Sequence, residues 1–139
     1  MRASEKWLHS VLYDKAGWVV EKLDNWQSKK VLPILWAEGA RIPFRGEEFV
    51  LQLIPGKRGA VARLHGEVLH VPVGMEAEVA RIEKMVTNWY RIEALRVFME
   101  CVEHFSPLMK VSPHEIKLSS ARTQWGSCTV RGVVRLNWQ

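Results

Sequence analysis

The fold class depends first on the stretch EEFVLQLIPG, residues 47–56. Its apolar residues alternate with polar ones, which is typical of a half-buried β-strand, until Pro55-Gly56 marks a turn. Beyond this turn, residues 61–64 and 68–73 are predicted as two strands of a hairpin, because they flank His65-Gly66-Glu67, which has the composition of a hairpin loop. The pattern predicts a small antiparallel β-sheet over residues 41–73.

Helical periodicity lies on both sides of this sheet. Residues 1–32 predict an amphipathic helix, because apolar residues recur at spacings of three, four, seven and eight before Pro33 prevents continuation. Residues 76–105 predict a long helix of about eight turns that ends before Ser106-Pro107. Cys101 lies on the apolar face of this helix, so we expect it in the core.

The C-terminal part returns to a period of two. After Ser112-Pro113, residues 114–139 predict a β-hairpin whose two strands are joined by a polar, glycine-containing loop over 122–132. The order of helix, sheet, helix and hairpin indicates an α+β fold. A chain of 139 residues is long enough for one domain, so we expect a single domain over residues 1–139.

Composition excludes several classes of protein. Hydrophobic residues make up 47% of the chain and charged residues 25%, which excludes a wholly disordered chain. No apolar run reaches the ~18 residues of a membrane-spanning helix, so we expect no membrane partner. The polar N-terminus does not resemble a secretory signal. Two cysteines cannot build a disulfide framework, and we expect a cytoplasmic protein.

The charge balance points to acidic partners. The net charge is +5 and the isoelectric point is near 9.5, which suits a nucleotide or a nucleic acid as well as an ordinary solvated surface. The spacings between Arg81, Arg91 and Arg96 do not place all three on one edge of a helix. In the sequence, the net charge is therefore the one feature that supports nucleic-acid binding.

No metal site is predicted from the histidines. His65 and His70 are an odd number of residues apart, and we expect them on opposite faces of a regular hairpin. His114-Glu115 opens like H-E-x-x-H, but Leu118 stands where the second histidine belongs. Cys128 has Arg122 and Arg131 near it in sequence, which would favour a thiolate nucleophile; a small packed thiol is the simpler interpretation.

One C-terminal block carries a specific resemblance. Its matching residues are Arg122-Thr123, Trp125-Gly126-Ser127-Cys128, Arg131-Gly132 and Leu136-Asn137-Trp138. On these residues the chain resembles the YgjP-like metallopeptidase family, whose architecture is related to that of the SprT-like zincins. Gln124 departs from the pattern, because the family more often has a basic residue there.

The resemblance implies a metal-dependent hydrolase. In that family the matching hairpin is followed by a helix with H-E-x-x-H and a later histidine, which bind zinc, while the glutamate activates water. These 139 residues contain none of that set, so the resemblance implies a truncated metalloprotease scaffold that binds no zinc alone and is inactive alone. We expect no catalytic residue or metal ligand here. The residues expected in a substrate cleft or motif are Arg122, Trp125, Gly126, Ser127, Cys128, Asn137 and Trp138.

Four functions stay open. The first is the N-terminal, non-catalytic part of a zinc peptidase acting on peptides or proteins, with residues 133–138 as an edge strand that holds an extended peptide. The others are a metal-dependent hydrolase of nucleotides or other phosphorylated substrates, a nucleic-acid-binding module without enzymatic activity, and a structural remnant. We also expect Trp125 to be buried, so that Trp125→Ala would cost about 3 kcal/mol.

Overall fold

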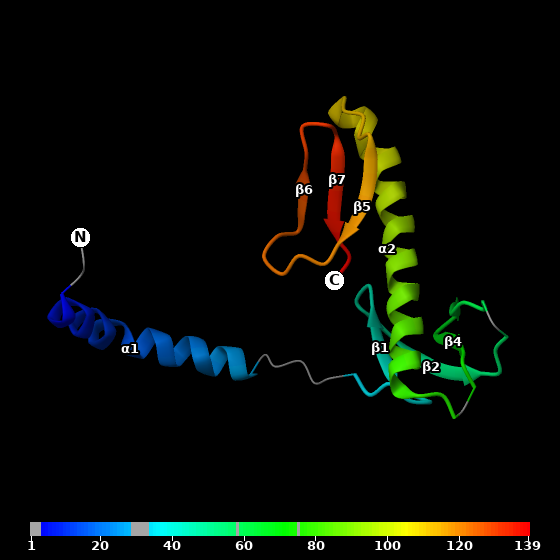
Figure 1. Ribbon diagram of the computed structural model, residues 1–139, viewed down its shortest axis with the longest axis horizontal. Coiled ribbons are helices and arrows are strands. Elements are labelled where there is room, and N and C mark those ends of the chain that lie inside the picture. Colours follow the sequence, from blue (N-terminus) through cyan, green and yellow to red (C-terminus); the bar gives the residue numbers. More distant parts are fainter. Residues whose placement is uncertain (1–3, 29–33, 58, 75) are drawn as a thin grey trace. The chain divides into compact units, whose positions relative to one another are not determined.

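The computed structural model describes residues 4–28, 34–57, 59–74 and 76–139 (Figure 1). The chain divides into two compact units, residues 1–33 and 34–139, and each is described by itself. The first unit contains α1 (Glu5–Ser28). The second contains β1 (Arg41–Phe44), β2 (Glu47–Ile54), β3 (Arg63–His65), β4 (Val68–Pro72), α2 (Val79–Met109), β5 (Glu115–Ser119), β6 (Gly126–Cys128) and β7 (Val133–Asn137). The α+β class is confirmed.

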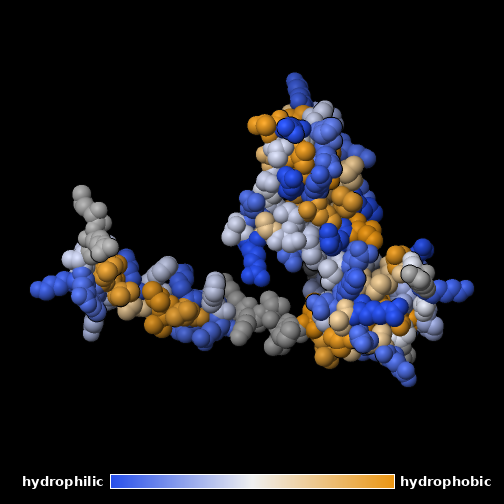
Figure 2. Space-filling model, viewed as in Figure 1, coloured by the Kyte–Doolittle hydropathy of each residue, from blue (hydrophilic) through white to orange (hydrophobic). Residues whose placement is uncertain are grey.

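The first unit is one uninterrupted helix. Its start is fixed by Ser4, whose Oγ accepts a hydrogen bond from the Trp7 N–H at 3.3 Å. Gly17 does not break the helix. No residue of α1 is buried, and apolar side chains form much of its visible surface (Figure 2). The ends of the predicted helix, residues 1–3 and 29–32, lie outside the described residues.

Sheet A contains four strands in the order β1-β2-β4-β3. The predicted all-antiparallel pairing was wrong, because β2 and β4 are parallel, with Val50 opposite Val68. The reason is that β3, a strand of three residues, lies at the far edge of the sheet and pairs antiparallel with β4. The chain therefore reverses direction twice between β2 and β4, and β4 lies between β2 and β3 in the sheet.

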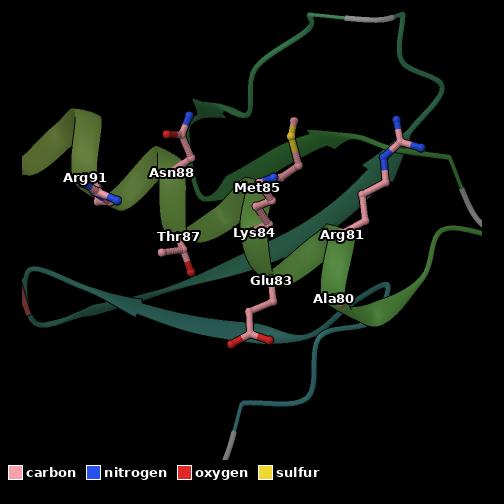
Figure 3. Close-up of a pocket in the computed structure, with 8 residues that line it drawn as sticks. All are labelled: Ala80, Arg81, Glu83, Lys84, Met85, Thr87, Asn88 and Arg91. Carbon is pink, nitrogen blue, oxygen red and sulfur yellow. The ribbon is translucent and has the colours of Figure 1, made fainter.

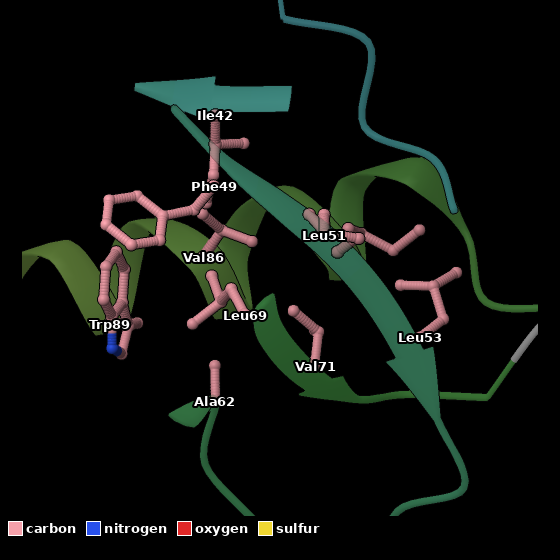
Figure 4. Close-up of a cluster of buried hydrophobic side chains, with 10 residues drawn as sticks. Ile42, Phe49, Leu51, Leu53, Ala62, Leu69, Val71, Val86 and Trp89 are labelled. Atoms are coloured by element: carbon pink, nitrogen blue, oxygen red, sulfur yellow. The ribbon is translucent and has the colours of Figure 1, made fainter. Parts of the chain in front are cut away.

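The core lies between one face of sheet A and the first turns of α2 (Figure 4). Alternate residues of β2 are buried, as the period of two predicts. Helix α2 contributes Ile82, Val86 and Trp89 at the spacing of a single helical face. Trp89 packs against Phe44 of β1, with ring centroids 4.8 Å apart. The buried set is Ile42, Phe49, Leu51, Leu53, Ala62, Leu69, Val71, Ile82, Val86 and Trp89.

Helix α2 extends one turn further than predicted. Pro107 was expected to follow the helix but lies inside its last turn. A proline there removes one backbone hydrogen bond and crowds the carbonyl four residues earlier, but the helix ends two residues later and the fixed φ of proline suits a helix. The helix ends at Lys110, which has φ 54° and donates its N–H to the Pro107 carbonyl. Cys101 is exposed on this helix, so its expected place in the core was also wrong.

Sheet B contains three strands in the order β5-β7-β6. The predicted hairpin of two strands was wrong, since β5 and β7 are parallel and Glu115 lies opposite Val133. The loop predicted over 122–132 contains β6, which pairs antiparallel with β7. Both sheets thus contain the same three-strand arrangement, in which the last strand lies between the first two. The parallel partners are 18 residues apart in both sheets.

Candidate functional site

The motif residues of the C-terminal block fall into two groups, and the first group closes a loop. The Asn137 side chain donates its Nδ2–H to the Ala121 carbonyl at 3.0 Å. The Trp138 N–H donates to the Ser119 carbonyl at 3.2 Å, and its indole Nε1–H donates to Ser120 Oγ at 3.4 Å. Asn137 and Trp138 therefore fix the chain where it leaves β5. Their side chains donate hydrogen bonds within the chain, which explains why an asparagine and a tryptophan stand at these positions.

The second group lies on an exposed strand. Gly126, Ser127 and Cys128 form β6, and all three are exposed. Trp125 precedes them with 85% of its surface exposed, so its predicted burial was wrong. Arg122 is exposed in the loop before this strand. The composition of the block suggested a turn with packed side chains, whereas a short strand leaves them on the surface.

Sheet B has two edge strands, β5 and β6, and of these β5 contacts helix α2. The predicted edge strand, residues 133–138, was wrong because β7 lies between β5 and β6 (Figure 1). In the part of the chain that the structure describes, no strand pairs with the other side of β6. Gly126 lies tightly against β7, since a Cβ there would come within 2.7 Å of the Arg135 carbonyl oxygen. A side chain at this position would push the edge strand away from the sheet.

Cys128 is not the packed thiol that the sequence favoured. It is exposed, and its Sγ lies 3.5 Å from the Thr129 carbonyl. A thiolate nucleophile needs a base within hydrogen-bond reach. Among the described residues, the Thr129 carbonyl is the hydrogen-bond partner of this thiol, and a carbonyl cannot take the proton.

His65 and His70 lie on the same face of sheet A, so their predicted separation to opposite faces was wrong. A turn of two residues places His65 opposite Val68 and Arg63 opposite His70. Residues directly opposite one another share a face, and so do residues two apart on one strand. An odd spacing across a turn of two residues therefore brings the histidines together. Their ring centroids are 5.0 Å apart.

The described residues do not provide a catalytic zinc site. Catalytic zinc ions take three protein ligands and keep one position for water. No group of three or more His, Cys, Asp or Glu side chains that could hold a metal occurs within residues 4–28, 34–57, 59–74 and 76–139. We therefore derive no catalytic step through a metal ion from these residues.

A cationic hollow on α2 is a feature that the sequence did not lead us to expect. It has a volume of about 730 Å³, and Arg81, Lys84, Asn88 and Arg91 lie along it (Figure 3). Their spacing of three, four and three keeps them within about 80° of one helical face. The spacings of Arg81, Arg91 and Arg96 alone do not show this face, because Lys84 completes it between Arg81 and Arg91. Arg96 does not line the hollow and pairs with Glu93 and Glu100.

The charges of this hollow are only partly balanced locally. Glu83 also lines it. Within the described residues, no ion pair involves Arg81, Lys84 or Arg91. The three cations are therefore available to an anionic partner. The signal for this patch was present in the sequence, as cations and an amide at helical spacing.

The comparisons with known proteins agree with the motif. No curated protein and no solved structure gave a significant match. None of the described helices is long and apolar enough to cross a membrane. A family model described as the YgjP-like metallopeptidase domain matches residues 1–139. The chain therefore belongs to the YgjP-like metallopeptidase family.

Proposed function

We propose that this chain is the non-catalytic, peptide-holding part of a zinc-dependent, cytoplasmic metallopeptidase. Membership of a metallopeptidase family supports a peptide or protein substrate. The 139 residues contain no H-E-x-x-H sequence, so the proposal assigns zinc binding and hydrolysis to a complete protein that supplies this motif. The role of the present residues is then to bind the substrate in an extended conformation.

The observation that carries this proposal is the open edge of β6. The Asn137 N–H donates to the Trp125 carbonyl at 2.7 Å, and the Thr129 N–H donates to the Val133 carbonyl at 3.0 Å. Trp125 and Thr129 therefore direct their backbone groups toward β7, and Ser127 shares this direction because the pattern repeats every two residues. The backbone groups of Gly126 and Cys128 point the other way, toward an added strand.

Side chains next to this edge offer a second contact. Trp125 and Ser127 are two residues apart, so they lie on one face of sheet B, while Cys128 lies on the other. An extended peptide bound at β6 would place alternate side chains on these two faces. The exposed indole of Trp125 is the largest apolar surface available to one of them.

A proline substitution tests the edge directly. Cys128→Pro removes an outward N–H without removing a bond to β7, whereas Cys128→Ala keeps that N–H and removes the thiol. We expect Cys128→Pro to weaken binding of a labelled extended decapeptide about tenfold, and Cys128→Ala to change it less than twofold. Equal affinities for the two variants would contradict the proposal.

A modified peptide tests the same main-chain pairing without a substitution that could affect folding of the protein. Methylation of alternate backbone nitrogens in the decapeptide deletes donors while the side chains stay the same. We expect one of the two methylation registers to lose affinity for the unmodified chain by about tenfold, because only one set of amides faces the strand. Equal binding in both registers would mean that main-chain pairing is absent.

The cationic hollow on α2 supports a second candidate function, which is nucleic-acid binding. Three cations on one helical face suit successive phosphates. We expect a single-stranded oligonucleotide to bind at about 50 mM salt, with a log–log salt slope that falls by about 2 when Arg81, Lys84 and Arg91 are replaced by glutamine. Arg41→Gln is the control, because Arg41 is exposed but pairs with Glu48. An unchanged slope would remove this candidate.

A further inference from the structure

We infer that His65 and His70 form a two-imidazole site for a divalent transition-metal ion on the exposed face of sheet A. The inference does not depend on the proposed peptidase function, because it concerns a different sheet and a different kind of ligand. It also differs from a catalytic zinc site, since it uses two protein ligands and leaves the remaining positions to water.

The strand register places the two rings together. His65 ends β3 and His70 is in β4, on either side of the turn at Gly66, which has φ 58°. Because Gly tolerates this left-handed conformation, the turn can be as short as two residues. Both histidines lie on the face of the sheet opposite the buried Leu69 and Val71. His65 is exposed and His70 is half-buried.

The separation of the rings suits one shared ion. A metal–nitrogen bond of about 2.0 Å places each ring centroid about 3 Å from the ion, so two ligands of one ion have centroids about 4.5–5 Å apart. The observed separation is 5.0 Å, with an angle of 36° between the ring planes. Because χ2 of histidine is a broad torsion, each ring can rotate to turn one nitrogen toward a shared ion.

The chemistry of the pair selects the class of metal. Neutral imidazole is a ligand for nickel, copper and zinc rather than for magnesium or calcium. Arg63 lies directly opposite His70 and places a positive charge beside the site. Gln52, which is opposite His70 on its other side, carries no charge. The site therefore depends on the two imidazoles, and Arg63 weakens it.

Nickel is a suitable probe, because its paramagnetism broadens nearby NMR signals. We expect one Ni²⁺ per chain to bind saturably and to broaden the ring signals of His65 and His70 before those of His9, His104 and His114. His65→Ala and His70→Ala should each lower the affinity at least tenfold, and the double variant should be no weaker than either single variant. The losses are not additive in a chelate, because removal of either histidine already leaves the ion with a single imidazole ligand.

Matched variants control for other nickel ligands. His9→Ala and His114→Ala should leave the affinity unchanged, and Arg63→Gln should raise it. Circular dichroism and thermal unfolding without metal should be the same for all variants, because the two histidines are outside the core. Simultaneous broadening of all five histidines, or additive losses in the double variant, would overturn the site. Neither result would affect the peptide-binding test at β6.

Discussion

Two tryptophans of the second unit show how differently the same residue type is used. Trp89 is 4% exposed and packs against Phe44 and Tyr90. Trp125 is 85% exposed and lies next to the open strand β6. The sequence separates them only indirectly: Trp89 has helical spacing from Ile82 and Val86, while Trp125 belongs to no long periodic segment.

Alanine substitutions should reproduce this difference in the free energy of unfolding. Trp89→Ala removes a buried aromatic side chain and is expected to cost about 3–5 kcal/mol. Trp125→Ala removes an exposed side chain and is expected to cost less than about 1 kcal/mol. Urea unfolding of both variants checks this. A large cost for Trp125→Ala would show that this side chain is covered in solution.

Tyr90 links helix α2 to sheet A. Its hydroxyl donates a hydrogen bond to the Pro43 carbonyl at 2.6 Å. Burial raises the pKa of Tyr90 above its ordinary value of 10.0, because the ionised form would lose its hydration. The folded state therefore holds this proton more tightly than the unfolded state does. The resulting stability is fully present below pH 10 and is lost as the pH rises through the folded pKa.

Phenylalanine substitutions test this pH dependence. Tyr90→Phe should lower the free energy of unfolding by about 1 kcal/mol at neutral pH, since it deletes one hydrogen bond. Above about pH 10, the unmodified protein should lose stability faster than the variant does. The chain has one other tyrosine, Tyr13 on α1, which is exposed, so Tyr13→Phe is the control. Parallel pH curves for Tyr90→Phe and the unmodified protein would contradict the assignment.

At the scale of elements, hydrophobic periodicity predicted which segments are helices and strands. It also predicted the hairpin of β3 and β4, which is confirmed. It did not predict that β4 pairs in parallel with β2, because the pattern does not show which strand of the hairpin lies next to β2. Strand β6 has three residues, too few to show a period, so it resembled a loop and β5 was expected to pair directly and antiparallel with β7. The candidate site changed with the pairing, because β6 rather than β7 has the open edge.

Substitution of two glycines by alanine should change stability in opposite directions. Gly17 lies inside α1, and a Cβ at this position would meet nothing within 4 Å. Gly17→Ala should therefore stabilise this helix by about 1 kcal/mol and raise the helix content of the first unit. Gly56 faces the Pro72 backbone, where a Cβ would lie 2.1 Å from the carbonyl oxygen.

Circular dichroism and thermal unfolding distinguish the two cases. Gly56→Ala should lower the unfolding temperature of the second unit, because the backbone next to β4 must move. Gly17→Ala should leave that temperature unchanged while the helical signal increases. A decrease in helical signal for Gly17→Ala would indicate that this glycine has a role beyond the helix itself.

At the scale of the second unit, burial is uneven. Every residue of the hydrophobic core belongs to sheet A, its connections or the first half of α2. None of the described residues of β5, β6 and β7 is buried. Sheet B adds hydrogen bonds and partial packing against α2, but it does not add an enclosed core of its own.

Amide hydrogen exchange should follow this distribution. We expect the amides of β2, β4 and residues 82–89 to exchange only on global unfolding, and those of β5, β6 and β7 to exchange through lower-energy openings. Mass spectrometry of exchanged peptides measures the difference. Equal protection in the two sheets would indicate that sheet B is covered in solution, for example by association between chains.

The arrangement shared by the two sheets has a consequence for synthesis on the ribosome. Strands β2 and β5 cannot pair with their parallel partners until 18 more residues have been made. We expect the hairpins β3–β4 and β6–β7 to close on the timescale of microseconds and to dock as units on β2 and β5. The unpaired edges of β2 and β5 are thus exposed to chaperones for the time that the ribosome needs to complete their partners.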